Sequence, residues 1–538
     1  MHEMLAAAVL VDLTDYEPSK RTRQSGAAAT TGKPEIIISP DRPGIVDAAE
    51  RALASTGIVY VRSRQLVRVI RDHGARGWLE RPKGSPVIVQ IERDHLLDLL
   101  GRAATWIVIR DGTPKETSPP AWVAAMLMAR GEWKLPQLEA IADAPVFRAD
   151  GTIHEHPGYD ERTRVIFDPC GVRFPSVPVS PSHADAKNAL AELLDPFSEF
   201  PFVADSDRAA TAAMVLSILG RAAIDGCVPM FASQAPAPGS GKGLLVDTVA
   251  MIATGRESPK MSPTEDDEET RKRLLAIALE SPSMIMIDNV EGAIGGPSLA
   301  MALTAGEVRD RVLGSTKMVT ATLRPVWAMT GNNIQLKGDL GRRVVPIDLD
   351  PKQEHPEDRT FNRGEPLTSY VARHRAALVV AALTVLRGFV VAGRPAHGHS
   401  AKGSFESWDR LVRAAIIWAG GADPLGGVTR IRTGADEDLD QLRALLVAWD
   451  GLIGCHAVTI ADAIKRAGGS GALWDAFSAY CPNGKPPNAR GLGYVLRAKQ
   501  GRVAANLVLR RGSADRDGVM RWRVTAPTAA AEDVIERG

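Results

Sequence analysis

The chain has few features that would tie it to a disulfide framework, a structural zinc or a membrane. Its four cysteines, Cys170, Cys227, Cys455 and Cys481, form no CxxC pair, which argues against disulfides and zinc and fits a reducing compartment. No apolar run approaches the ~20 residues of a membrane span. No Lys or Arg precedes the short apolar run at the N-terminus, as a secretory signal requires. We therefore expect a cytoplasmic protein without a membrane partner.

Charge and composition show no bias toward any partner. Lys and Arg total 65 and Asp and Glu total 64, which gives a net charge of +1. No overall field therefore draws the protein to nucleic acid, so such an attraction must come from a local patch. Apolar residues make up 45% and charged residues 24%, which argues against disorder over most of the length.

Composition and periodicity divide the chain into five segments. A polar, aperiodic tail precedes an α+β domain, in which short β-like runs alternate with helices. Fully apolar strands separated by helices follow and indicate an open α/β sheet. A helical segment comes next, and the last module has three helices and two strands. In chain order these segments are 1–34, 35–175, 185–355, 356–425 and 438–526.

A glycine-rich turn, PAPGSGKG from Pro236 to Gly243, lies between an apolar strand and a helical run. Such a turn supplies free backbone N–H groups and the positive end of a helix dipole, which together bind phosphate. Pro236 stands where the usual motif has its first glycine, and Gly243 replaces the hydroxyl residue that normally binds Mg²⁺. We predict an ATP site with Lys242 on the β and γ phosphates, and its contacts are Pro238, Gly239, Ser240, Gly241, Lys242, Gly243 and Leu244.

Two further strand ends carry side chains that suit the same site. The apolar strand 283–287 ends at Asp288, which we expect to hold Mg²⁺. Glu291 is a candidate for polarising the attacking water, although the base more often occupies the position of Asn289. The next apolar strand runs into Asn332, which can orient water against the γ-phosphate. The alternative for Asp288 is a residue that merely ends a strand.

Arg342 and Arg343 follow, just before another apolar strand. Arginines in this position can reach the nucleotide of a neighbouring subunit and stabilise charge that develops during phosphoryl transfer. An arginine pair taken alone is more often a solvated face or an ion-pair partner. The order of four such features on four strand ends favours the catalytic interpretation.

Together these residues resemble AAA+ ATPases, and within them the helicase modules of phage and mobile-element primase-helicases, relatives of superfamily 3 and poxvirus-type enzymes. The matching segments, which include PGSGKGLL, IDNVEG, VWAMTGNN and GDLGRRVVPIDLD, span about residues 185 to 425. The resemblance implies an AAA+ P-loop core at 185–355 with a helical lid at 356–425. It also implies ring-shaped, usually hexameric, ATP-driven motors that pull single-stranded DNA through a central channel.

The resemblance further implies a pore-lining hairpin between the Mg²⁺ carboxylate and the asparagine strand. In this sequence the hairpin is RVLGSTKMVTATLR, and Lys317 at its turn is the expected phosphate contact. Arg309 and Arg311 are weaker candidates. An ordinary surface hairpin is the alternative outside the AAA+ context.

The last module offers separate evidence for DNA. Its three helices and strand hairpin predict a winged helix-turn-helix. Between Lys485 and Arg523 there are ten Lys or Arg and two acids, which is an electrostatic footprint for duplex DNA. The alternative is a protein-contact module. The expected DNA contacts are Arg490, Arg497, Lys499, Arg510, Arg511 and Arg521.

These features predict an ATP-hydrolysing DNA helicase or translocase that acts in the replication of a phage or mobile element. The expected site uses Lys242 and Asp288 of one subunit and Arg342 or Arg343 of the next. Two alternatives stay open: a DNA-binding replication initiator whose ring uses nucleotide mainly to assemble, and a winged-helix regulator switched by nucleotide. The sequence is compatible with a separate primase as a further partner.

Overall fold

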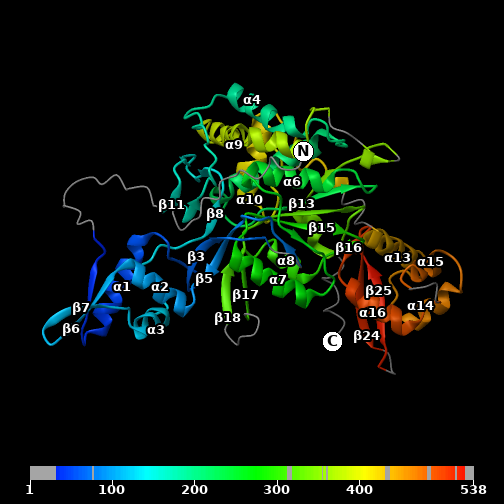
Figure 1. The fold of residues 1–538 in the computed structure, drawn as a ribbon. Coiled ribbons are helices and arrows are strands. Elements are labelled where there is room, and N and C mark those ends of the chain that lie inside the picture. Colours follow the sequence, from blue (N-terminus) through cyan, green and yellow to red (C-terminus); the bar gives the residue numbers. More distant parts are fainter. Residues whose placement is uncertain are drawn as a thin grey trace. The chain divides into compact units, whose positions relative to one another are not determined.

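The computed structural model of the chain consists of two compact units (Figure 1). The first unit is Met1–Val428 and the second is Thr429–Gly538. The predicted α/β class is confirmed, because parallel strands alternate with helices in the first unit. The structure describes residues 32–74, 78–311, 318–353, 355–358, 362–430, 437–481, 486–514 and 518–527.

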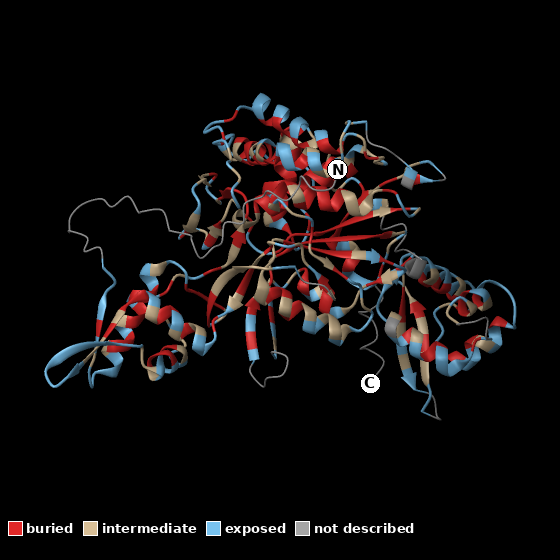
Figure 2. Ribbon diagram, viewed as in Figure 1, coloured by how far each residue is buried: buried red, intermediate tan, exposed pale blue. Residues whose placement is uncertain are grey.

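A six-stranded sheet forms the centre of the first unit. Its order is β21-β13-β19-β15-β14-β4, and every pair is parallel except β14 with β4. The longer parallel strands are almost wholly buried (Figure 2), as expected where helices cover both faces of a sheet. The strands are β13 (Met230–Ala235), β14 (Lys260–Met261), β15 (Met284–Val290), β19 (Val326–Asn332), β21 (Val344–Asp348) and β4 (Leu79–Glu80).

Helices cover the two faces of this sheet. Figure 1 places α4, α6 and α9 on one side and α7 and α8 on the other. Helix α5 packs in the same apolar core as α4, α6 and α9. The bounds are α4 (His183–Leu194), α5 (Asp205–Leu219), α6 (Lys242–Thr254), α7 (Asp267–Glu280), α8 (Pro297–Ala302) and α9 (Leu367–Val391).

The expectation that no apolar run approaches a membrane span is wrong for α9, which is long and apolar enough by length and composition alone. Its apolar residues instead pack in the core of the first unit. Of its most apolar 18-residue window, 61% is buried inside the protein. Its Arg375 is buried and donates to the carbonyl oxygens of Ile252 (3.1 Å), Ala253 (3.1 Å) and Asp143 (2.8 Å). Burial lowers the pKa of Arg375 to about 10. These bonds tie α9 to the end of α6.

Residues 35–175, predicted as a separate α+β domain, share the first unit with the central sheet. Two of the small sheets in this segment are β1-β6-β7 and β2-β3-β5, and the segment also contains three helices. It joins the centre through β4, and through buried Arg62, which donates to the carbonyl oxygens of Ala278 and Thr322. The elements are β1 (Glu35–Ile38), α1 (Arg42–Thr56), β2 (Tyr60–Arg62), β3 (Gln65–Arg71), β5 (Pro86–Gln90), α2 (Arg93–Ala103), β6 (Thr105–Arg110), β7 (Thr113–Thr117) and α3 (Ala121–Ala129).

Short strands complete the first unit around the central sheet. Strands β17 and β18 form an antiparallel hairpin, β16 pairs with β20, and β8, β11 and β12 make a third small sheet. Their bounds are β8 (Ala140–Ala142), β9 (Val146–Phe147), β10 (Ile153–His154), β11 (Gly158–Asp160), β12 (Val165–Phe167), β16 (Ala293–Ile294), β17 (Glu307–Arg311), β18 (Met318–Thr322) and β20 (Gln335–Leu336).

The segment after α9 contains a wide helical turn inside an otherwise ordinary helix. Helix α10 (Glu406–Trp408) continues into a π-helical turn at Asp409–Arg413 and then into α11 (Ala414–Trp418). Buried Trp408 donates from Nε1 to the Ser217 hydroxyl of α5 at 2.7 Å, which anchors this segment to the core.

The second unit combines helices with an antiparallel sheet in the order β22-β25-β24-β23. Its core includes Trp449, Phe477, Leu496 and Trp522. Thr459 and Asn488 cap α14 and α16 by accepting from the N–H groups of Asp462 (3.1 Å) and Gly491 (2.7 Å). The elements are α13 (Glu437–Ile453), β22 (Val458–Thr459), α14 (Ile460–Ala467), α15 (Ala472–Ser478), α16 (Ala489–Lys499), β23 (Val503–Ala504), β24 (Leu507–Ala514) and β25 (Met520–Thr525).

Candidate functional site

The glycine-rich loop follows β13 and leads directly into α6. Gly239 and Gly241 have φ angles of 72° and 86°, which glycine adopts readily and other residues rarely. A Cβ atom on Gly241 would also lie 3.4 Å from Cε1 of Phe200. The loop therefore needs glycine at 241 for its backbone conformation, and it leaves the first N–H groups of α6 at the carboxyl end of the sheet.

Two side chains close the loop on itself. The hydroxyl of buried Ser240 donates to the Ala237 carbonyl oxygen at 2.6 Å, and Lys242 Nζ donates to the same oxygen at 3.0 Å. Burial lowers the pKa of the Lys242 ammonium. An anion beside this ammonium would offset its desolvation, so the loop fits a phosphate group.

Gly243 occupies the first turn of α6, beside the loop. A Cβ added there meets no heavy atom within 4 Å among the described residues. The position thus has room for a side chain but supplies no hydroxyl.

Asp288 lies at the carboxyl end of β15, held by Thr330 of the adjacent β19. The Thr330 hydroxyl donates to Asp288 Oδ1 at 2.7 Å and accepts from the Asn289 N–H at 2.9 Å. Asn289 has a φ of 54°, and its side-chain amide donates to Glu291 Oε1 at 3.1 Å. Asp288 and Glu291 are therefore each fixed by a neighbour. No role for Thr330 was predicted from the sequence, although this residue directly precedes the Gly331-Asn332 pair.

Asn332 ends β19 and is registered opposite Ala235, the last residue of β13. Its Oδ1 atom is buried and has no hydrogen-bond partner within the described part of the chain. A buried polar atom without a partner is unfavourable, so this amide fits a ligand or water at the loop. Because β13 and β19 are parallel neighbours, Asn332 and the loop that follows β13 lie at the same edge of the sheet.

The site residues do not form a ready-made metal cage. Across the ranges that the structure describes, no group of three or more His, Cys, Asp or Glu side chains could hold a metal ion. A single carboxylate such as Asp288 fits the way Mg²⁺ is commonly bound, through one or two carboxylates together with substrate phosphates and water.

The two predicted arginines have different environments at the 3₁₀ turn Gly338–Arg343. Arg343 is buried and donates to the Ala300 carbonyl oxygen, to Thr304 Oγ1 (3.3 Å) and to Asp339 Oδ2 (2.6 Å). The Arg342 side chain is 53% exposed, and among the described residues it pairs with Asp339 alone. Arg342 is thus the member of the pair that another molecule can reach.

The predicted DNA contacts of the first unit lie on the β17–β18 hairpin. Arg309 and Arg311 are exposed on β17, opposite Thr320 and Met318. Between them, Asp310 accepts from Arg271 Nε of α7 at 2.9 Å, which fastens the hairpin to that helix. Lys317 lies outside the described residues.

The predicted DNA contacts of the second unit lie on α16 and on the β24–β25 hairpin. Arg490, Arg497 and Arg511 are exposed, whereas Lys499, Arg510 and Arg521 are half-buried. Two of the half-buried side chains contact other residues of the unit. Arg510 donates to the Pro527 carbonyl oxygen at 3.2 Å, and the Lys499 ammonium lies 6.0 Å from the centre of the Tyr480 ring.

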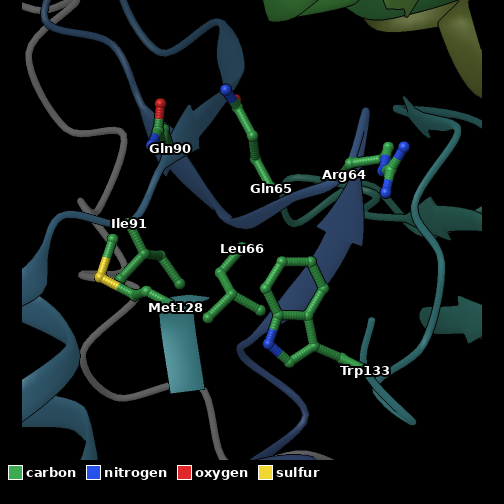
Figure 3. A pocket seen from close by; sticks show the side chains of 7 residues that line it. All are labelled: Arg64, Gln65, Leu66, Gln90, Ile91, Met128 and Trp133. Atoms are coloured by element: carbon green, nitrogen blue, oxygen red, sulfur yellow. The ribbon is translucent and has the colours of Figure 1, made fainter. Parts of the chain in front are cut away.

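A small pocket lies elsewhere in the first unit (Figure 3). Its walls come from β3, β5, α3 and the loop after α3, and they include Gln65, Leu66, Met128 and Trp133. None of the predicted nucleotide or DNA residues lines it, so it is separate from the glycine-rich loop.

No family model and no curated protein matches the chain. Three similar solved structures illustrate its neighbours. A JCV helicase bound to an acetamide compound is 14% identical and covers 50% of this chain and 74% of its own, with a TM-score of 0.20. The apo C-terminal region of NrS-1 is 10% identical. Its match covers 89% of this chain and 99% of the NrS-1 region, with a TM-score of 0.33. SCCmec type IV Cch, described as an active helicase, is 10% identical. Its match covers 87% of this chain and 97% of the Cch chain, with a TM-score of 0.31. At these values the family stays a prediction.

Proposed function

We propose that this protein is an ATP-dependent DNA helicase or translocase of the AAA+ type, acting in the replication of a phage or mobile element. The observation that carries the proposal is the meeting of three strand ends. The Lys242 loop after β13, Asp288 on β15 and Asn332 on β19 come from strands that are adjacent in the sheet, and Asn332 is registered opposite Ala235. Such convergence at the carboxyl edge of a parallel sheet supports a nucleotide site.

Each residue then has a defined role in phosphoryl transfer to water. The α6 N–H groups and Lys242 bind the phosphates, and Asp288, held by Thr330, would hold Mg²⁺. The metal would neutralise charge on the phosphates. Asn332 would orient the attacking water and Glu291 would polarise it, and the hydrogen bond from Asn289 restrains Glu291.

The DNA-contacting surfaces and the assembly belong to the same proposal. Single-stranded DNA would pass the β17–β18 hairpin, with Lys317 and Arg311 on phosphates, and duplex DNA would bind the second unit as a winged helix. A ring, usually hexameric in the resembled family, would bring Arg342 of one subunit to the nucleotide of the next. The exposure of Arg342 supports this role for it over buried Arg343.

A second candidate function is a DNA-binding replication initiator that uses ATP mainly to assemble. Gly243 favours it, because the first turn of α6 lacks the hydroxyl that normally completes Mg²⁺ binding. This candidate predicts nucleotide-dependent assembly with slow hydrolysis and no unwinding.

ATPase and strand-unwinding measurements on the full chain test the proposal. We expect DNA-stimulated hydrolysis and unwinding in the wild type, and a loss of roughly 100- to 1,000-fold in Lys242→Ala, since one preorganised charge contact is removed. Lys187→Ala, which removes an exposed lysine of α4, serves as the matched control and should keep both activities. If the wild type hydrolyses ATP no faster than Lys242→Ala, the motor proposal fails. Hydrolysis-independent assembly on DNA would then favour the initiator.

A further inference from the structure

One face of helix α16 presents a tyrosine between two arginines. Arg490, Tyr494 and Arg497 are spaced by four and three residues, which places them on the same side of the helix. Both arginines are exposed, and 79% of Tyr494 is exposed. A single exposed aromatic residue needs no explanation by itself, so the argument depends on its surroundings.

The packing of α16 fixes this face toward the outside of the second unit. Leu492 and Leu496, on the opposite side, are buried at 2% and 0% exposure. Gly493 brings the helix close to α14, since a Cβ there would lie 3.4 Å from Cδ1 of Ile460. Asn488 caps the first turn. The buried leucines and the close approach at Gly493 hold the helix against the unit, and they leave Tyr494 uncovered.

The segment that contains this face is strongly cationic. Between Lys485 and Arg523 the sequence has ten Lys or Arg and two acids. Such a surface attracts phosphates strongly, because each neutralised phosphate releases counterions. A cluster of Lys and Arg on one helix and the adjoining hairpin is an electrostatic footprint for nucleic acid.

The size of α16 is compatible with duplex DNA. The major groove of DNA is about 12 Å wide and admits an α-helix. Arg490 and Arg497 are about 10 Å apart along the helix axis, with Tyr494 between them on the same face. A helix lying in the groove can present Tyr494 to the base edges while the long, flexible arginine side chains reach phosphates.

We infer that α16 enters the major groove and that Tyr494 is the residue that reads DNA sequence there. Its ring would pack on a thymine methyl group and its hydroxyl would hydrogen-bond to a base edge, whereas Arg490 and Arg497 bind phosphates and carry no sequence preference. The inference rests on the proposed DNA binding of the second unit and adds to it the residue that sets specificity.

Selection of binding sites from a random pool of duplexes, with the full chain, tests the inference. We expect the wild type to enrich one sequence class, and Tyr494→Ala to lose roughly 5- to 150-fold of discrimination against the non-selected sequence. The slope of log affinity against log salt should stay unchanged in Tyr494→Ala. Arg497→Ala should weaken all sequences alike and reduce that slope by about 1. Thermal unfolding of each variant checks that the unit stays folded.

The other outcomes separate the inference from the function on which it rests. If Tyr494→Ala selects the same sequence as strongly as the wild type, Tyr494 does not read DNA and only the inference fails. A wild type that binds duplex without preference overturns the inference in the same way. A wild type that binds no duplex, or that binds polyglutamate as tightly, removes the proposed DNA function of this unit as well.

Discussion

At the scale of single residues, Gly243 decides how the nucleotide site can use Mg²⁺. The other features of the site are glycines with left-handed φ angles, a lysine whose pKa is lowered by burial, and Asp288 held by Thr330. Space for a side chain at 243 exists, because nothing described lies within 4 Å of an added Cβ. The missing hydroxyl is therefore not imposed by crowding within this chain.

Restoring that hydroxyl should strengthen the use of Mg²⁺. We expect Gly243→Ser to lower the Mg²⁺ concentration that gives half-maximal ATPase activity, because the serine hydroxyl can join Asp288 and the phosphates around the metal. Gly243→Ala is the matched control: it gains about 1 kcal/mol of helix propensity but has no ligand atom. Equal Mg²⁺ dependence in the serine and alanine variants would contradict the prediction.

At the scale of elements, the π-helical turn Asp409–Arg413 is held by a buried arginine with two carboxylate partners. Arg413 donates to both oxygens of Asp423 at 2.8 and 2.7 Å and to Asp409 Oδ1 at 2.7 Å. Burial of Asp423 opposes its ionised form, but the hydrogen bonds and charge of Arg413 outweigh it and lower the pKa of Asp423. These bonds join the turn to the loop that follows α11.

Removing the Asp423 charge should destabilise this segment in a pH-dependent way. We expect Asp423→Asn to lower the free energy of unfolding by about 1.5–3 kcal/mol at pH 7, measured by urea titration. Because the pKa of Asp423 is lower in the folded protein than its unfolded-state value of about 3.9, the ionised carboxylate stabilises the fold above that pH. This stabilisation is lost as the pH falls through the pKa of Asp423 in the folded protein. The difference between wild type and variant should therefore shrink below about pH 4.

An exposed ion pair provides the comparison for Asp423. Arg102 and Asp98 lie four residues apart on α2 at 2.8 Å, with side chains 73% and 46% exposed. Asp98→Asn should change stability by less than about 1 kcal/mol. If the two variants behave alike, the buried arginine network does not hold the turn.

At the scale of the whole molecule, the proposed ring would complete the ATP site of one chain with Arg342 of the next. Arg343 is bound within its own chain, whereas exposed Arg342 pairs with Asp339. An exposed pair of this kind contributes little to stability, so Arg342 can exchange Asp339 for a nucleotide phosphate. This is the arrangement that a head-to-tail ring would use.

Mixing two inactive variants tests that arrangement. Arg342→Ala and Lys242→Ala should each lose ATPase activity when assembled alone. Mixed in equal amounts, they should recover about one quarter of the wild-type rate, because a random ring contains interfaces in which both residues are intact. No recovery, or full activity of Arg342→Ala alone, would show that the site does not take Arg342 from a neighbour.

Local patterns in the sequence determined the elements that carry the site. The strand, glycine turn and helix at 230–254 could be predicted because left-handed turns, apolar strands and helix starts depend on residues within a short window. The strand ends at Asp288 and Asn332 followed in the same way. The cationic excess of the last module is likewise a property of composition alone.

Only the tertiary structure decided which of these residues meet and which side chains are free. It placed Asn332 opposite Ala235, brought Thr330 to Asp288, joined β4 to the central sheet, buried Arg343 while exposing Arg342, and uncovered Tyr494. The reason is physical. Strand neighbours and the buried side of a helix depend on contacts between distant segments, and apolar periodicity alone does not name the partner.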